Sequence, residues 1–290
     1  KMDSLLLSVR GEPQNLRLQL EAQQLYYGMD RPLSQLQLNS RLGNDSMTVQ
    51  LSGLENSKRS TRTRLAFGGN ATEENDTYRF AFTEDFFLNN QPWKINPANE
   101  FLYDNNALNI RQFSLTNQDQ KIALRTEQLN TKDELAPLII SFNDFRVSEI
   151  LKLLQLEELD YEGDINGCVT LKDYTSKLNY LADLQINNIL LGERAVGNLT
   201  LSAAQDNPRK PLIRLQAGLD GPEGKVNAAG TYAINNQYLD LGASFEALRV
   251  RLLDPFLFGL IRESSGKVNG DFKIAGKANA PKLEGSMDLD

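Results

Sequence analysis

The chain has 290 residues and a formal net charge of −7, which argues against the phosphate backbone of a nucleic acid as its partner. It contains no histidine and one cysteine, Cys168, so His-dependent catalytic triads, the common zinc sites and an internal disulfide are excluded. No apolar run reaches the about 20 residues that a transmembrane helix needs, and the N-terminus lacks the organisation of a signal peptide.

Apolar and polar residues alternate along many short stretches, as they do in half-buried β-strands. Turn signals such as Gly68-Gly69-Asn70 separate these stretches at short intervals, which predicts hairpins and meanders. Helical stretches between strands are nearly absent, which argues against a parallel Rossmann or TIM architecture and predicts an all-β antiparallel fold. In chain order, the apolar rows are Leu16, Leu18 and Leu20; Tyr78, Phe80 and Phe82; Leu138, Ile140 and Phe142; Ile213, Leu215 and Ala217; and Leu239, Leu241, Ala243 and Phe245.

Two short helices are predicted, each directly after an alternating strand. The first has an apolar stripe at i, i+3, i+4 and i+7, which includes Leu151, and the second begins with Asp254 as a cap and Pro255 at the first helical position. We expect both helices to plug one end of the β structure. Their apolar residues are Val147, Ile150 and Leu154 in the first helix and Phe256, Leu257 and Leu260 in the second.

These helices belong to an internal repeat with an offset of 103 residues. Residues 136–187 and 239–290 each contain an alternating strand, a short helix and a strand with the pattern Gly-x-[Ile/Val]-Asn-Gly, and residues 1–135 supply preceding strands of the same sheet. The strand glycines permit bends or a close backbone approach. The matching pairs include Phe142 and Phe245, Arg146 and Arg249, Gly163 and Gly266, Asn166 and Asn269, and Gly167 and Gly270.

The second repeat resembles the repeated block of TamB and its AsmA-like relatives. The resemblance is carried by residues 264–276 (SSGKVNGDFKIAG) and 280–289 (APKLEGSMDL). A second stretch, residues 92–100 (PWKINPANE) followed by Leu108-Asn109-Ile110 and Leu115, is similar to TamB-like proteins of the Bacteroidetes type. The resemblance covers residues 86–290, whereas residues 1–85 agree only in their general sequence pattern.

The resemblance implies a periplasmic piece of a longer cell-envelope protein, held in the inner membrane by an N-terminal anchor outside this sequence. Residues 1–290 would form one continuous segment, an elongated and curled antiparallel sheet that makes an open groove, with the two helices at repeat boundaries. The implied function is phospholipid transport between the inner and outer membranes and outer-membrane biogenesis. The implied partners are lipid acyl chains and, through other parts of the chain, an outer-membrane assembly protein of the BamA type.

A groove of this kind shelters acyl chains without chemistry, so we expect no enzyme activity, no catalytic residue, no cofactor and no metal. A chain of about sixteen carbons costs on the order of 12 kcal/mol when it is left in water, so a carrier must shield it throughout. The predicted groove-lining residues are Leu138, Ile140, Phe142, Ile213, Leu215, Leu239, Leu241, Phe245, Phe272 and Ile274.

Other interpretations of the same residues stay open. Alternating strands are equally typical of an ordinary closed core. A long unprotected sheet edge would instead favour a scaffold that templates outer-membrane protein strands by β-augmentation. The aromatic stretch around Trp93, with Phe86, Phe87, Phe101 and Tyr103, would suit a glycan-binding or glycan-cleaving domain if exposed rings lay beside paired acids.

Overall fold

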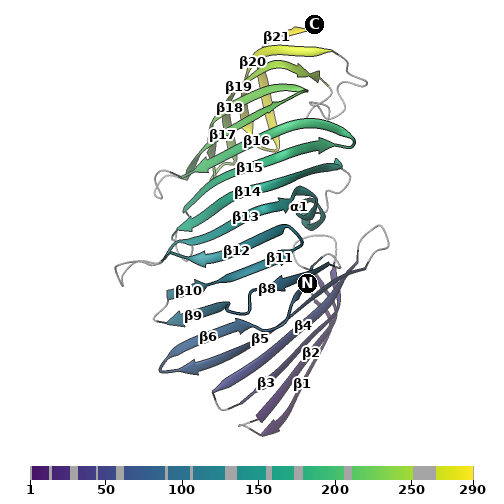
Figure 1. Ribbon diagram of the computed structural model, residues 1–290, viewed down its shortest axis with the longest axis vertical. Helices are drawn as coiled ribbons and strands as arrows, with labels where there is room; N and C mark the ends of the chain where they lie inside the picture. Colours follow the sequence, from purple (N-terminus) through teal and green to yellow (C-terminus); the bar gives the residue numbers. More distant parts are fainter. Residues whose placement is uncertain are drawn as a thin grey trace. The chain divides into compact units, whose positions relative to one another are not determined.

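The computed structural model describes residues 2–12, 15–26, 32–43, 45–56, 62–88, 91–104, 107–127, 136–154, 159–172, 179–205, 211–250 and 266–289 (Figure 1). These residues form 21 strands and one short helix, and every pairing between the strands is antiparallel, which confirms the predicted all-β class. Contacts within the chain define two compact units, Lys1–Leu138 and Ile139–Asp290.

The first unit is a sheet that divides at one long strand. Strands β1 to β5 pair in chain order, and β5 then pairs with both β6 and β7. One branch continues from β6 to β9 and β10, and the other from β7 to β8, β11 and β12. The strands are β1 Met2–Glu12, β2 Asn15–Tyr26, β3 Pro32–Leu42, β4 Ser46–Asn56, β5 Arg62–Glu74, β6 Thr77–Phe82, β7 Phe86–Leu88, β8 Gln91–Ile95, β9 Glu100–Asp104, β10 Ala107–Arg111, β11 Phe113–Asn117 and β12 Gln120–Thr126.

The second unit is a meander in which β14 to β21 pair in chain order. No pairing between described residues joins β21 back to β14, so this ladder is open. The elements are β13 Leu138–Arg146, α1 Val147–Leu154, β14 Tyr161–Lys172, β15 Asn179–Leu191, β16 Arg194–Ala204, β17 Leu212–Gly221, β18 Gly224–Ala233, β19 Tyr238–Arg249, β20 Lys267–Lys277 and β21 Ala280–Leu289.

Helix α1 confirms the first predicted helix and packs against β14. Its first turn carries Glu149 and its last turn Lys152, an order that complements the helix dipole, and their side chains form an ion pair at 2.9 Å. The second predicted helix, with Phe256, Leu257 and Leu260, lies outside the described residues.

Three irregularities of the same form interrupt strands of the second unit, and register shifts identify those of β15 and β19 as bulges. In each of the three, a residue other than glycine adopts a positive φ, and its N–H donates to the side-chain oxygen of an asparagine on the next strand. Asn166 and Asn269, which match in the sequence repeat, therefore do the same task. The pairs are Asp144 (φ 46°) with Asn166 Oδ1 at 3.0 Å, Asn188 (φ 54°) with Asn198 Oδ1 at 2.9 Å, and Ala247 (φ 49°) with Asn269 Oδ1 at 2.7 Å.

The bulges decide where the core of this unit lies. A bulge adds one residue to a strand, so the alternation of side chains changes phase and residues on either side of it share one face. At the bulge of β19 the register shifts between Phe245 and Leu248. Leu248 (1% exposed) and Val268 (0%) are buried there with Val250, and Val226 and Phe245 pack against them. The tightly packed core therefore follows the bulged ends of the strands.

Candidate functional site

The pairing register of β14–β21 places apolar residues opposite apolar residues from strand to strand. One side of the sheet is apolar as a result, and we call it the apolar face. The opposite side, the polar face, carries residues such as Asp183, Gln216 and Asn227. The rows of the apolar face are Ala182, Ala203, Leu215, Leu241 and Ile274; Leu184, Leu201, Ala217, Ala228, Ala243 and Phe272; and Ile165, Ile186, Leu199, Leu219, Val226 and Phe245.

Most side chains in these rows are only half-buried. Ile165 (5% exposed) and Ala243 (6%) are the buried exceptions. Inward-facing side chains of a close-packed sandwich lose almost all of their accessible surface. The half-burial of Leu215, Leu241 and Phe272 therefore means that no second layer of described residues seals the apolar face.

The middle row of the apolar face carries small side chains at its centre. Ala217, Ala228 and Ala243 follow one another in register there, between rows that carry leucine and phenylalanine. Rows on one face of a strand are about 6.8 Å apart, so the three alanines leave a lane across the strands between larger side chains. Ala217 and Ala228 are half-buried, and Ala243 at the end of the lane is buried.

The registers bring most of the predicted groove-lining residues onto this face. Ile213, Leu215, Leu239, Leu241, Phe245, Phe272 and Ile274 share it, although Ile213 is buried at 4% exposure. The rings of Phe245 and Phe272 lie 5.1 Å apart.

Leu138, Ile140 and Phe142 share one side of β13, and all three are half-buried. The ring of Phe142 lies 5.6 Å from that of Phe145, on the other side of Asp144 in the sequence. In helix α1, Val147 and Ile150 are half-buried and Leu154 is the last residue.

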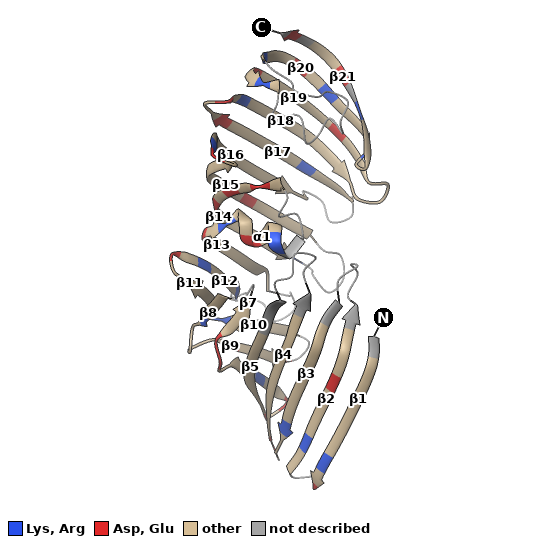
Figure 2. Cartoon of the chain, turned by 90° about the vertical axis from the view of Figure 1, so that its right-hand side faces the viewer, with Lys and Arg blue, Asp and Glu red and all other residues tan. Residues whose placement is uncertain are grey.

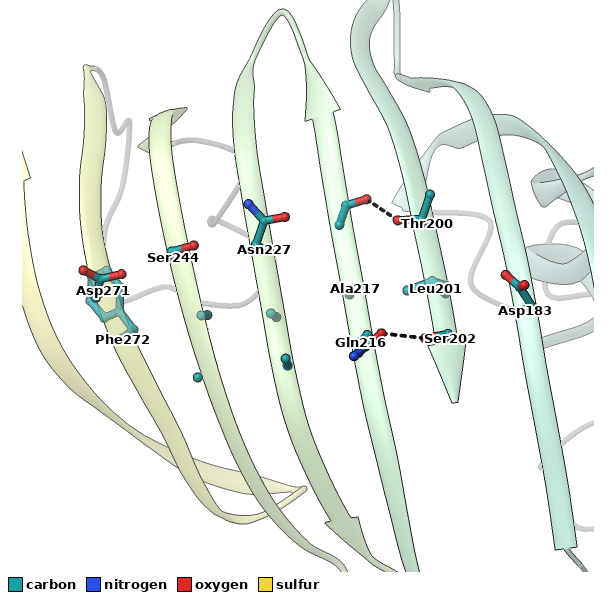
Figure 3. A pocket seen from close by; sticks show the side chains of 15 residues that line it. Asp183, Thr200, Leu201, Ser202, Gln216, Ala217, Asn227, Ser244, Asp271 and Phe272 are labelled. Atoms are coloured by element: carbon teal, nitrogen blue, oxygen red, sulfur yellow. Dashed lines mark hydrogen bonds between the residues drawn. The ribbon is translucent and has the colours of Figure 1, made fainter. Parts of the chain in front are cut away.

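The polar face of this unit has a hollow of about 800 Å³, which the sequence did not predict (Figure 3). Its floor is low because Gly218, Ala229 and Gly242 lack long side chains. Thr200 Oγ1 donates to the Gly218 carbonyl at 3.3 Å, and Ser202 Oγ donates to Gln216 Oε1 at 3.4 Å. The polar side chains around it are those of Asp183, Thr200, Ser202, Gln216, Asn227, Ser244 and Asp271.

In the first unit, six phenylalanine rings form one cluster. Phe82 is its centre, with neighbouring ring centroids at 4.7–5.8 Å, and every ring is half-buried. Mostly edge-to-face contacts of this kind are worth about 0.5–1.5 kcal/mol per pair beyond the buried area. The five rings around Phe82 are those of Phe67, Phe80, Phe86, Phe101 and Phe113.

The aromatic residues considered above for a glycan-binding platform differ widely in how far their side chains are exposed. Trp93 is 1% exposed, so its ring offers no face to a sugar. Tyr103 is 45% exposed at the other extreme. Among the described residues, no group of three or more His, Cys, Asp and Glu side chains could hold a metal ion.

Two tyrosines of the second unit have a perturbed acidity. Burial raises the pKa of Tyr161 above 10.0, because the phenolate would be poorly solvated. Burial also raises the pKa of Tyr180, and the charge of Tyr232 raises it further. Both hydroxyls are therefore neutral at physiological pH.

None of the described helices has the length and apolar character needed to cross a bilayer. Comparisons with protein-family models, with characterised proteins and with solved structures give no match, so the function has to be argued from the residues of this chain.

Proposed function

We propose that this chain is a non-catalytic segment whose apolar face shields the acyl chains of phospholipid. The observation that carries the proposal is the set of half-buried apolar rows that run across β14–β21 with a lane of alanines between them. Contiguous apolar surface that stays partly accessible to solvent marks a place where something binds. The proposal assigns that place to lipid tails.

The dimensions of the face suit an acyl chain. Neighbouring strands are about 4.8 Å apart, so the eight strands from β14 to β21 span about 34 Å. The hydrocarbon core of a bilayer is about 30 Å thick and holds two chains end to end, so one chain is about 15 Å long. A chain lying across the strands would therefore meet apolar residues along its whole length, and each buried methylene would gain about 0.8 kcal/mol.

The polar face supports a position in an aqueous compartment, because its Asp, Gln and Asn side chains are exposed where the apolar rows are not. We place the segment in the periplasm, in a TamB-like or AsmA-like protein that serves phospholipid transport and outer-membrane biogenesis. An inner-membrane anchor and an outer-membrane assembly protein of the BamA type are parts of this proposal that other segments of the protein would supply.

The sharpest test uses two consecutive residues of β17 that lie on opposite faces. Leu215 is half-buried on the apolar face and Gln216 is exposed on the polar face. A photoreactive amino acid at residue 215 should capture phospholipid from cells or vesicles, as identified by mass spectrometry, and the same amino acid at residue 216 should not. Capture of protein alone at residue 215, or equal lipid capture at both positions, would contradict the proposal.

A second pair of variants blocks the lane. Ala228→Phe adds a ring to the alanine row, whereas Ala229→Phe adds the same ring to the polar face one residue further along β18. We expect Ala228→Phe to reduce lipid capture at residue 215 and Ala229→Phe to leave it unchanged, with circular dichroism showing that both variants fold. Equal effects of the two variants would refute the assignment of the lane.

One observation favours a scaffold as a second candidate function. Four apolar side chains of β1 are more exposed than the other large apolar side chains of the described residues. Their exposed fractions are 54% for Leu5, 61% for Leu6, 56% for Leu7 and 56% for Val9. Among the described strands, β1 pairs only with β2, so its outer edge offers backbone groups for β-augmentation. Photo-crosslinking from residue 6 to an unfolded outer-membrane protein, without lipid capture at residue 215, would favour this function.

A further inference from the structure

Three arginines of the first unit stand side by side on neighbouring strands. Arg10 of β1 is opposite Arg17 of β2, and Arg17 is opposite Arg41 of β3. Figure 2 shows the corresponding blue bands next to one another across these strands. Neighbouring strands are about 4.8 Å apart, so three cations share a row about 10 Å long. We call this set the arginine row.

The arginine row is not neutralised within the part of the chain that the structure describes. None of its three guanidinium groups makes an ion pair with a described carboxylate, whereas Arg79 and Arg111 both pair with Glu100. All three side chains are exposed. Like charges directly opposite one another in a sheet are destabilising, and the chain as a whole carries −7. The row therefore costs stability that a bound anion would return.

A hollow of about 410 Å³ adjoins the row, with Arg17 and Arg41 in its wall. Its acidic residue is Glu84, whose Oε1 accepts a hydrogen bond from Gln50 Nε2 at 2.7 Å. Most of the other polar groups are amides and a hydroxyl that can donate to an anion, from Gln19, Asn39, Thr48, Gln50 and Asn70. The site therefore combines fixed positive charge with neutral donors in a concave surface.

We propose that the arginine row and its hollow bind a phosphate-bearing ligand. A guanidinium presents a planar pair of donors that matches two phosphate oxygens, and several of them in a row suit a group with more than one negative charge. The phosphate can belong to a soluble compound or to a lipid headgroup. The site lies on polar residues of the first unit, so it does not depend on the proposed role of the apolar face of the second.

The test measures thermal unfolding of the full chain with inorganic pyrophosphate, compared with chloride at the same ionic strength. Pyrophosphate should raise the melting temperature of the wild-type protein and should not raise that of R10Q/R17Q/R41Q. The control variant K94Q/K121Q/R125Q also loses three exposed cations of the first unit and should keep the response. In titration calorimetry, R17Q alone should weaken pyrophosphate binding about tenfold or more, since a hydrogen bond to a charged group is worth about 1.5–3 kcal/mol.

A second readout separates binding from a structural role. Without ligand and at low salt, R10Q/R17Q/R41Q should melt at the same temperature as wild type or higher, because the repulsion between like charges is removed. A lower melting temperature would show that the arginines hold the sheet together instead, and would overturn the proposal. So would equal stabilisation by pyrophosphate and chloride, or loss of the response in the control variant.

The source of the phosphate is decided with vesicles of phosphatidylcholine that contain or lack phosphatidic acid. Recruitment only to the acidic vesicles, lost in R10Q/R17Q/R41Q, would identify a lipid headgroup. Protection by pyrophosphate without such recruitment would identify a soluble phosphate compound. Absence of both responses in the wild-type protein would refute the site.

Discussion

Replacing Asn269 by alanine tests whether the asparagine clamp holds the bulge of β19 and the core beside it. Asn269 Oδ1 accepts the N–H of Ala247 at 2.7 Å, next to Val268 (0% exposed) and Leu248 (1%). Ala247 adopts a φ of 49°, which is costly for a residue with a Cβ and persists only where its surroundings impose it. A partly buried N–H without its acceptor costs about 1–3 kcal/mol, so we expect Asn269→Ala to lower the free energy of unfolding by about 2 kcal/mol.

The assay is urea unfolding followed by circular dichroism, with a thermal scan in which this loss corresponds to about 4–8 °C. Asn269→Asp keeps an acceptor oxygen and should retain most of the stability. Asn227→Ala removes an exposed asparagine from the polar face and should change the free energy of unfolding by less than about 0.5 kcal/mol. The reasoning is refuted if Asn269→Ala is as mild as Asn227→Ala, or if Asn269→Asp is as harmful as Asn269→Ala.

Three further predictions follow from the same unit. Gly224→Ala should destabilise by about 2–4 kcal/mol in urea unfolding, because φ is +116° there and the new Cβ would lie 2.5 Å from Leu248 Cα. Leu248→Ala in the core should cost about 2–5 kcal/mol, whereas Leu241→Ala on the half-buried apolar face should cost clearly less; equal losses would show that the face is closed. The raised pKa values of Tyr161 and Tyr180 mean that the folded state holds these protons more tightly than the unfolded state, so the contribution of these two groups to stability should be constant below pH 10 and fall as pH rises above it. Phenolate absorbance should show the late ionisation, and Tyr161→Phe should remove its share.

Strand positions were predictable from the sequence wherever one face is apolar and the other polar. Leu239, Leu241 and Phe245 alternate with Asp240, Gly242 and Ser244, and the structure places the two sets on opposite faces of β19. This succeeds because the side-chain period of a strand is two residues, so the face of each residue follows from its parity. The helix at Val147–Leu154 was predictable for the equivalent reason with a helical period.

The bulges were not predictable, because they break the parity on which the argument rests. Phe245 and Leu248 differ by an odd number of positions and yet share one core, owing to the bulge at Ala247. A signal in the sequence was the repeated asparagine at residues 166 and 269, whose role depends on a positive φ in the preceding strand. Ala247 gives no sign of such a backbone conformation, and Asp144 and Asn188 belong to residue types that are enriched at positive φ but are too common in turns to locate a bulge.

The hollow of the polar face, the hollow of the first unit and the arginine row were missed because they depend on register across strands. Arg10, Arg17 and Arg41 are dispersed in the sequence, and only the pairing of β1, β2 and β3 brings them together. Register follows from turn length and from the sum of all cross-strand contacts, neither of which local composition reveals. A search for clustered charges along the sequence cannot find a cluster of this kind.

An open apolar face needs another source of stability than a closed core. In the second unit, the backbone groups of the central strands form hydrogen bonds with the neighbouring strands. The bulged ends of the strands supply a compact core around Leu248 and Val268. The half-buried rows around Ala217, Ala228 and Ala243 are therefore not required to close upon a second layer for the sheet to hold its form. Side chains in a closed core are fixed by their neighbours, whereas side chains on the apolar face keep part of their surface accessible. The separation of the packed strip from the open rows would let the sheet remain folded while it carries out the proposed lipid binding.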